Sequence, residues 1–407
     1  MHEIKGEKIL KIKISKFTSL VLIAIFALSA ATYVHAQSVT STITVSSEPV
    51  GIAYDSKMGE LFVVNYVSGD IMVISDKTNT VVNDITALQL YAGAPYNVAA
   101  DSGNGEIYVS DATGVYVISD ATNAIVANIT TSGSWGAVAY DSGKGEIFVS
   151  YPQPVFPQAP YSVISDTTNT IIANITTQST PSSAPTSLVY DSGKGEIFAS
   201  ELGDVAVISD STNSVLTTIS VTNPGSMAYD PAKGEVFVAS GATVSVISDS
   251  SNKVVASIST GLAAYPNPTL AYDSGKGEIY ANGIDGVAVI SDTNNKVIGT
   301  VNTGFKSSTG IAYDSGMGEI FAVNGPAESD SGTIAAGTVA VISDASGTLA
   351  SSNPTASQSA TSNVTPSPSP TVPEFSVSAL ILVAGAAVIV TLCVIVSAAK
   401  KRRLQRS

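Results

Sequence analysis

The chain has 407 residues and carries 33 Asp and Glu against 19 Lys and Arg, a net charge of −14 at pH 7. Residues 37–399 are more acidic, because they contain nine Lys, 31 Asp and Glu and no Arg, a net charge of −22. This part lacks the clustered cations that neutralise nucleic-acid phosphates. It also has no His, and its one Cys, Cys393, lies in an apolar C-terminal segment that is predicted below to span the membrane. The part before that segment therefore has no disulfide, and it lacks the usual imidazole or thiol of hydrolases and of zinc or copper sites.

Residues 1–36 are predicted to be a secretory signal peptide. A basic segment runs from Lys5 to Lys16, an apolar segment follows at Leu20 to Ala31, and Val34–Ala36 supplies the small residues of a cleavage site. We expect the mature chain to begin at Gln37. An uncleaved membrane anchor is the alternative.

Residues 37–345 repeat one unit seven times. Each unit contains a version of "AYDSGKGEIF", and the intervals between its aspartates are 39 to 50 residues. A period near 40 residues is typical of a repeat architecture. The seven aspartates are Asp55, Asp101, Asp141, Asp191, Asp230, Asp273 and Asp314.

Every unit has the same internal order of four short apolar runs bounded by Gly, Asn, Asp and Ser. In the sixth unit these runs are "TLAYD", "EIYAN", "VAVISD" and "KVIGTV". Short β-branched runs between such turn residues indicate strands, and no segment keeps a helical apolar period. The sequence therefore predicts an all-β fold, a seven-bladed β-propeller with four-stranded antiparallel blades.

The seventh unit lacks its fourth run, because "ASGTLASSN" follows the third. An additional apolar segment, Val39–Ser47, stands before the first unit. We expect this N-terminal strand to complete the seventh blade and close the ring, which leaves no open sheet edge.

The repeats also resemble a known family. "LFVVN" at Leu61–Asn65, "EIYVSD" at Glu106–Asp111 and "IFAVN" at Ile320–Asn324 are each followed by a "VISD" strand and a "T-N-x-V-V-x-x-I" strand. They are similar to YVTN-type β-propeller repeats of archaeal and bacterial surface proteins, with "I-S-D" in place of the usual "V-I-D". The resemblance covers residues 37–345 and implies a propeller at a cell surface.

The C-terminal part is predicted to tether the propeller. Residues 346–374 form a Ser/Thr/Pro-rich stalk, residues 375–399 a transmembrane helix or sorting signal, and residues 400–407 a basic cytoplasmic tail. "PEF" at Pro373–Phe375 resembles the start of an archaeal sorting signal. The expected location is the cell surface, with a single membrane pass and the N-terminus outside.

The repeated turn has a structural interpretation. We expect Asp273 to bond the turn backbone, Gly275 and Gly277 to supply positive φ angles, and Lys276 to point to water. Because all seven copies are alike, a ligand site is expected on the opposite face, where the loops differ. Two loops there are long, at Ser150–Ser162 and Asn324–Gly337.

Three sets of candidate site residues follow from this choice of face. Aromatic side chains favour sugar or protein contact, although each is also a candidate for the core; they are Tyr66, Tyr96, Trp135, Tyr151, Phe156, Tyr161, Tyr265 and Phe305. Weak candidates for a Ca²⁺ site are Asp111, Glu201, Asp204, Asp285 and Asp330, but their spacing matches no metal motif, so we predict no metal or other cofactor. The possible N-glycosylation sites are Asn128, Asn174 and Asn363.

The sequence predicts a non-enzymatic binding, adhesion or surface-layer structural module. Its expected partner is a protein or glycan of the cell envelope or the extracellular space, and not a nucleic acid. The alternative is an extracellular hydrolase or lyase that uses carboxylates and a divalent metal at the central channel.

Overall fold

The computed structural model describes the central part of the chain. The chain divides into two compact units, Met1–Leu349 and Ala350–Ser407, and every described residue belongs to the first. The predicted signal peptide, stalk, C-terminal span and tail lie outside the described residues. No helix in the described part is long and apolar enough to cross a membrane. The described residues are 37–86, 95–131, 136–151, 160–175, 185–263, 267–284, 286–305, 307–325 and 336–343.

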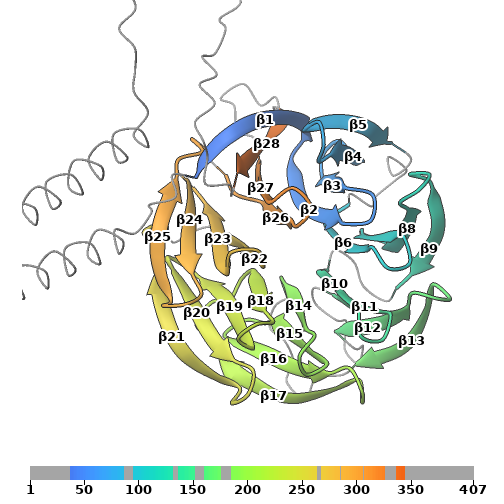
Figure 1. Ribbon diagram of the computed structural model, residues 1–407. Helices are drawn as coiled ribbons and strands as arrows, with labels where there is room; N and C mark the ends of the chain where they lie inside the picture. Colours follow the sequence, from blue (N-terminus) through green and yellow to red (C-terminus); the bar gives the residue numbers. More distant parts are fainter. Residues whose placement is uncertain are drawn as a thin grey trace, which may run out of the picture. The chain divides into compact units, whose positions relative to one another are not determined.

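Seven four-stranded antiparallel sheets surround a central axis as the blades of a propeller (Figure 1). This confirms the predicted all-β, seven-bladed fold. Blade 1 contains β2 (Pro49–Asp55), β3 (Glu60–Asn65), β4 (Asp70–Ser75) and β5 (Thr80–Ile85); blade 2 contains β6 (Asn97–Asp101), β7 (Glu106–Ser110), β8 (Gly114–Ser119) and β9 (Ile125–Thr130); blade 3 contains β10 (Val138–Asp141), β11 (Glu146–Ser150), β12 (Tyr161–Ser165) and β13 (Thr170–Ile175).

The remaining blades follow the same order, from the channel outward. Blade 4 contains β14 (Leu188–Asp191), β15 (Glu196–Ser200), β16 (Asp204–Ser209) and β17 (Ser214–Ser220); blade 5 contains β18 (Met227–Asp230), β19 (Glu235–Ser240), β20 (Thr243–Ser248) and β21 (Lys253–Ser259); blade 6 contains β22 (Thr269–Asp273), β23 (Glu278–Gly283), β24 (Gly286–Ser291) and β25 (Lys296–Val301); blade 7 contains β26 (Gly310–Asp314), β27 (Glu319–Asn324), β28 (Ala336–Ser343) and β1 (Ser38–Ser47).

Strand β1 closes the ring, as the missing run in the seventh unit predicts. It pairs antiparallel with β28, so that Ile43 lies opposite Val339. Ile43 and Val45 are buried against blade 1. The first and last strands of the propeller thus form one sheet, and β28 has no open edge.

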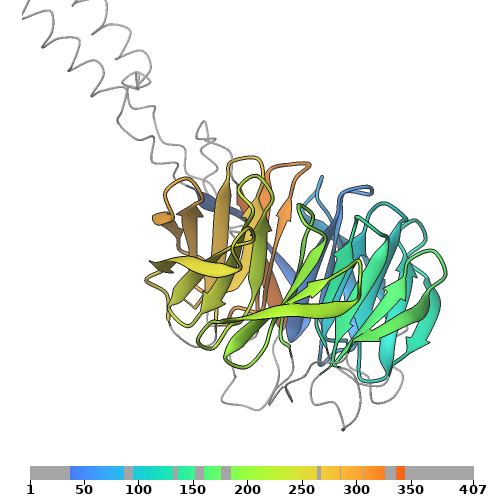
Figure 2. The same ribbon diagram turned by 90° about the horizontal axis from the view of Figure 1, so that it is seen from below.

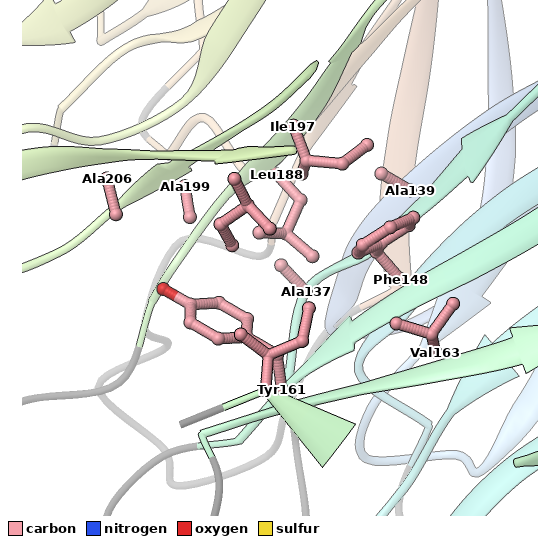
Figure 3. Close-up of a cluster of buried hydrophobic side chains, with 11 residues drawn as sticks. Ala137, Ala139, Phe148, Tyr161, Val163, Leu188, Ile197, Ala199 and Ala206 are labelled. Atoms are coloured by element: carbon pink, nitrogen blue, oxygen red, sulfur yellow. The ribbon is translucent and has the colours of Figure 1, made fainter. Parts of the chain in front are cut away.

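The core consists of apolar layers between neighbouring blades. In β7 and β11 every residue after the first is buried, because the second strand of a blade contacts both adjacent blades. The outermost strands alternate between exposed and less exposed positions. Figure 3 shows the layer between blades 3 and 4, with Phe148 and Tyr161 from one side facing Leu188 from the other. Equivalent clusters lie at all seven blade interfaces.

Closure by β1 predicts unequal effects for two isoleucines on outermost strands. Ile43 of β1 is 6% exposed, whereas Ile172 of β13 is 50% exposed. We expect Ile43→Ala to lower the free energy of unfolding by about 2–5 kcal/mol. The matched variant Ile172→Ala should change it by only about 0.5 kcal/mol. Urea denaturation measures both values, and equal losses would show that β1 does not seal the ring.

Candidate functional site

The propeller has two faces with different connections (Figure 2). The turns from the first to the second strand and from the third to the fourth strand of each blade lie on one face, here called the turn face. The turns from the second to the third strand and the connections between blades lie on the other, the loop face. Every gap between described residues of the propeller falls in a loop-face connection.

The turn face is built from the repeated turn. In blade 4, Oδ1 of the buried Asp191 accepts hydrogen bonds from the backbone N–H groups of Gly193 at 2.8 Å and Lys194 at 3.2 Å. Gly195 has a φ of +68°, and a Cβ there would lie 2.5 Å from Oδ2 of Asp210. Glycine is therefore required both by the backbone and by the carboxylate packed over it.

The predicted details of the sixth turn are confirmed in part. Oδ1 of Asp273 accepts the backbone N–H of Gly275 at 2.8 Å, and Gly277 has a φ of +68°. The prediction of a positive φ at Gly275 is wrong. Space is restricted there because a Cβ would lie 2.8 Å from the hydroxyl of Tyr313, which belongs to the next blade.

The prediction that the turn lysine points to water is also wrong. The Nζ atom of Lys276 is buried. In other blades the lysine of this turn reaches the aspartate at the end of the "VISD" strand of the following blade. These ion pairs are Lys57–Asp120 at 3.1 Å, Lys144–Asp210 at 3.7 Å and Lys233–Asp292 at 3.3 Å.

Carboxyl groups gather at the turn face in excess of these lysines. Burial raises the pKa of Glu196, the nearby Lys194 lowers it, and Asp191, Asp249 and Asp210 raise it again. The pKa is raised in the same way, with burial as the first cause, at Glu60, Glu146, Glu235, Glu319, Asp101, Asp210 and Asp249.

A cavity of about 340 Å³ lies at the loop-face end of the central channel. Residues at the start of the innermost strands of six blades, or one or two positions before it, line the cavity. Its wall combines apolar side chains such as Val50 and Ile52 with the phenol of Tyr96 and the amide of Asn97. The other polar residues of the wall are Thr186, Ser187, Ser226, Thr269 and Thr309. No charged side chain occurs among the described residues that line the cavity.

Hydrogen bonds between blades position these polar groups. Oγ of Ser187 accepts the backbone N–H of Met227 at 3.2 Å, and Oγ of Ser226 accepts that of Leu270 at 3.0 Å. Because each hydroxyl acts as an acceptor here, its own hydrogen stays free to be donated elsewhere. The hydroxyl oxygen of Thr309 is buried without a hydrogen-bond partner. The cavity wall thus holds unused hydrogen-bonding capacity.

The sequence singled out none of these Ser and Thr residues. Each stands within two residues of the start of an innermost strand, close to the channel axis. The alignment of the repeats locates this position in every unit, so it could in principle have indicated residues near the channel. A single Ser or Thr near the start of a strand is common, however, and only the closed ring shows that these residues come together.

The predicted aromatic residues lie in different environments. Tyr96 is exposed and lines the cavity, and Tyr66 is half-buried in the turn after β3. Tyr151, Tyr161 and Phe305 are buried in the layers between blades, so their rings do not form a surface. Trp135, Phe156 and Tyr265 lie outside the described residues.

The acidic candidates do not converge. Oδ1 of Asp111 accepts the backbone N–H groups of Thr113 at 2.6 Å and Gly114 at 2.8 Å, which makes it a local turn residue. Oε1 of Glu201 accepts the hydroxyl of Tyr161 at 2.6 Å, and burial raises the pKa of Glu201.

Asp204 accepts the hydroxyl of Ser220 at 3.1 Å, while Asp285 and Asp330 lie outside the described residues. Within the described ranges, no three His, Cys, Asp or Glu side chains are grouped to hold a metal.

Two of the three predicted glycosylation sites are in described strands. Asn128 of β9 and Asn174 of β13 are exposed on the outermost strands of blades 2 and 3. Oδ1 of Asn174 accepts the hydroxyl of Ser162 at 2.6 Å. Asn363 lies outside the described residues. Modification of these sites stays a prediction.

Comparisons with known proteins support the fold. No family model matches the chain, and no curated protein matches it by sequence. Among solved structures, the chain is similar to hydrazine synthase of Kuenenia stuttgartiensis, with a TM-score of 0.61 and 15% identity over 74% of this chain and 97% of that chain. At this identity the likeness shows a shared propeller fold and carries no conclusion about activity.

The raised pKa values predict a protein that gains stability on mild acidification. Where a folded carboxyl has a pKa above its unfolded value, the folded chain binds more protons, and its stability falls as the pH rises through that interval. The melting temperature should therefore be higher at pH 5 than at pH 7, since unfolded carboxyls titrate near about pH 4. The variant Glu196→Gln has a side chain that is neutral at every pH, so its melting temperature should depend less on pH than that of the wild type. A melting temperature that increases from pH 5 to pH 7 would contradict the prediction.

Proposed function

We propose that the chain is a non-enzymatic binding module of the cell surface, and that its ligand contacts the loop-face cavity. The observation that carries the proposal is the uncharged wall of hydroxyl and amide groups at the channel mouth. Such a wall suits a neutral ligand rich in hydroxyl groups. Each polar contact then replaces hydrogen bonds to water with hydrogen bonds to the protein, and no charged group loses its water. Carbohydrate is the ligand class that best meets this description.

Tyr96 gives the cavity its aromatic contact. The ring is exposed beside the channel mouth and next to Asn97, whose Oδ1 accepts the backbone N–H of Val138 at 3.4 Å. An aromatic face beside hydrogen-bonding groups is the usual arrangement for stacking on a sugar ring. The apolar wall around Val50 and Ile52 suits the C–H groups of the same ligand.

The surface location rests on the sequence of both chain ends and on the YVTN-like repeats. In this proposal the chain is exported and tethered through residues 375–399, so that its partners are envelope glycans and proteins. No carboxylate occurs among the described residues that line the cavity, so they offer no support for a hydrolase or lyase at that position.

Glycan binding by the full-length chain tests the proposal. On an array of envelope polysaccharides we expect retention that is weakened about tenfold by Tyr96→Ala, which corresponds to roughly 1.4 kcal/mol. Leu202→Ala is the matched control, because Leu202 is an exposed apolar residue of a loop-face turn that does not line the cavity. Retention that is absent, or that is unchanged by Tyr96→Ala, would contradict the assignment of this site.

The mature N-terminus tests the surface location separately. Intact-mass analysis of the chain from its native membrane should give a first residue of Gln37. A mass that includes residues 1–36, together with protease resistance of the propeller on whole cells, would place it inside the cell.

A further inference from the structure

One position of the repeat lies at the loop-face end of the innermost strand in every blade. It stands four residues before the turn aspartate, and around the propeller it is occupied by Gly51, Asn97, Ala137, Ser187, Ser226, Thr269 and Gly310. Its backbone bonds to the second strand, as the carbonyl of Ser187 does to the N–H of Ser200. The next residue therefore points its N–H away from the second strand, because successive residues of a strand direct their hydrogen-bonding groups to opposite sides.

In three blades a side chain of the preceding blade accepts this N–H. These hydrogen bonds join the N–H of Val138 to Oδ1 of Asn97 at 3.4 Å, that of Met227 to Oγ of Ser187 at 3.2 Å, and that of Leu270 to Oγ of Ser226 at 3.0 Å. A polar side chain at this position thus caps the N–H of the next blade and withdraws it from the channel.

Two glycines leave this N–H uncapped in blades 1 and 2. Gly310 of blade 7 precedes Ile52 of blade 1, and Gly51 of blade 1 precedes Val98 of blade 2. Ile52 and Val98 pair with their second strands in the same register as Val138, so their N–H groups have the same direction. A Cβ on Gly310 would lie 3.5 Å from the backbone nitrogen of Ile52, so a side chain there would cover this N–H. Among the described residues no side chain accepts either N–H.

The N–H of Ile311 in blade 7 is uncapped as well. The preceding side chain is that of Thr269, whose Oγ1 lies 3.4 Å from Oγ of Ser308 instead. Ile311, Ile52 and Val98 belong to adjacent blades, and all three line the cavity. One side of the cavity wall therefore carries three backbone donors that no side chain in the described part of the chain covers. We call these three N–H groups the donor arc.

Hydroxyl groups face the donor arc across the channel. The arc is centred on β2 of blade 1, and β14 of blade 4 and β18 of blade 5 lie on the far side of the channel (Figure 1). Ser187 and Ser226, directly before these two strands, line the cavity there. Each hydroxyl oxygen has two acceptor sites and uses one of them on a backbone N–H. The cavity thus offers donors on one side and further acceptors on the other.

We propose, on the basis of the carbohydrate binding proposed above, that the cavity selects a sugar with an acetamido group. A trans amide directs its carbonyl and its N–H to opposite sides, so the carbonyl accepts from the donor arc while the N–H donates to the hydroxyl oxygen of Ser187 or Ser226. The methyl group contacts the apolar side chains of Val50 and Ile52, which line the same side of the cavity. Because the group is uncharged, it enters this wall without desolvation of a charge.

A hydroxyl group in place of the acetamido group fits the cavity less well. It has no methyl group for the apolar wall, and it is too short to bond to both sides of the channel at once. A site that is built to bond a polar group discriminates against an analogue without it, because the polar groups of the site are then left unpaired.

Two disaccharides that differ in this group test the selection on the full-length chain. Calorimetry should give a Kd for N,N′-diacetylchitobiose that is about tenfold lower than the Kd for cellobiose, which has hydroxyl groups in place of the acetamido groups. Equal Kd values, with polysaccharide retention still sensitive to Tyr96→Ala, would overturn the selection and leave the proposed function intact. Binding of neither disaccharide would overturn it as well.

Two substitutions by serine separate the donor arc from general effects on the fold. Gly51→Ser supplies the missing hydroxyl beside Val98 without backbone strain, since Gly51 has no positive φ and the nearest atom to its Cβ would be 3.5 Å away. It should raise the Kd for N,N′-diacetylchitobiose about tenfold without lowering the melting temperature. Ala137→Ser makes the same change in blade 3, at a position outside the described cavity wall, and should bind as the wild type does. Equal losses in both variants would contradict the assignment.

Hydrogen exchange of the free chain tests the donor arc without a ligand. The amide of Val98 should exchange faster than that of Met227, because Ser187 caps the N–H of Met227. In Gly51→Ser the exchange of Val98 should become slower. Equal exchange of the two amides in the wild type would show that Val98 is already capped, and it would overturn the proposal.

Discussion

The apolar layer between adjacent blades is the interaction on which this molecule depends. A four-stranded sheet of this sequence is apolar on both sides of its second and third strands, so it is stable only between two neighbours. Seven such layers require a closed ring, and β1 supplies the strand that closes it. The same requirement explains why the chain enters and leaves the propeller in one blade.

The two faces then meet different demands. On the turn face every blade must join the next in the same way, which is why the aspartate, the glycine and the following carboxylate recur seven times. Ion pairs across the junctions partly offset the charge that this arrangement concentrates. On the loop face the connections do not have to join the blades in one repeated way. The cavity there is lined by residues that differ from blade to blade.

The sequence was sufficient to predict the architecture, because the number of repeats gives the number of blades and the runs within each repeat give the strands. The missing run after residue 345 and the additional run at Val39–Ser47 predicted ring closure, and the pairing of β1 with β28 confirms it. Contacts between blades were not predictable in this way. Lys276 was expected to point to water because its turn was considered alone. Tyr151, Tyr161 and Phe305 were candidates for both a recognition surface and the core, because the local sequence does not show which residues are buried between blades. The cavity wall was missed for the same reason, since it exists only when six strand ends meet.

The central claim is that recognition belongs to the loop face while the turn face holds the ring together. Hydrogen–deuterium exchange of the full-length chain, with and without a retained envelope glycan, tests it most directly. The account predicts slower exchange on binding at the starts of the innermost strands, around Asn97, Ser187 and Leu270, with no change in the turns that follow Asp191 and Asp273. Protection confined to those turns, with none at the channel mouth, would contradict it.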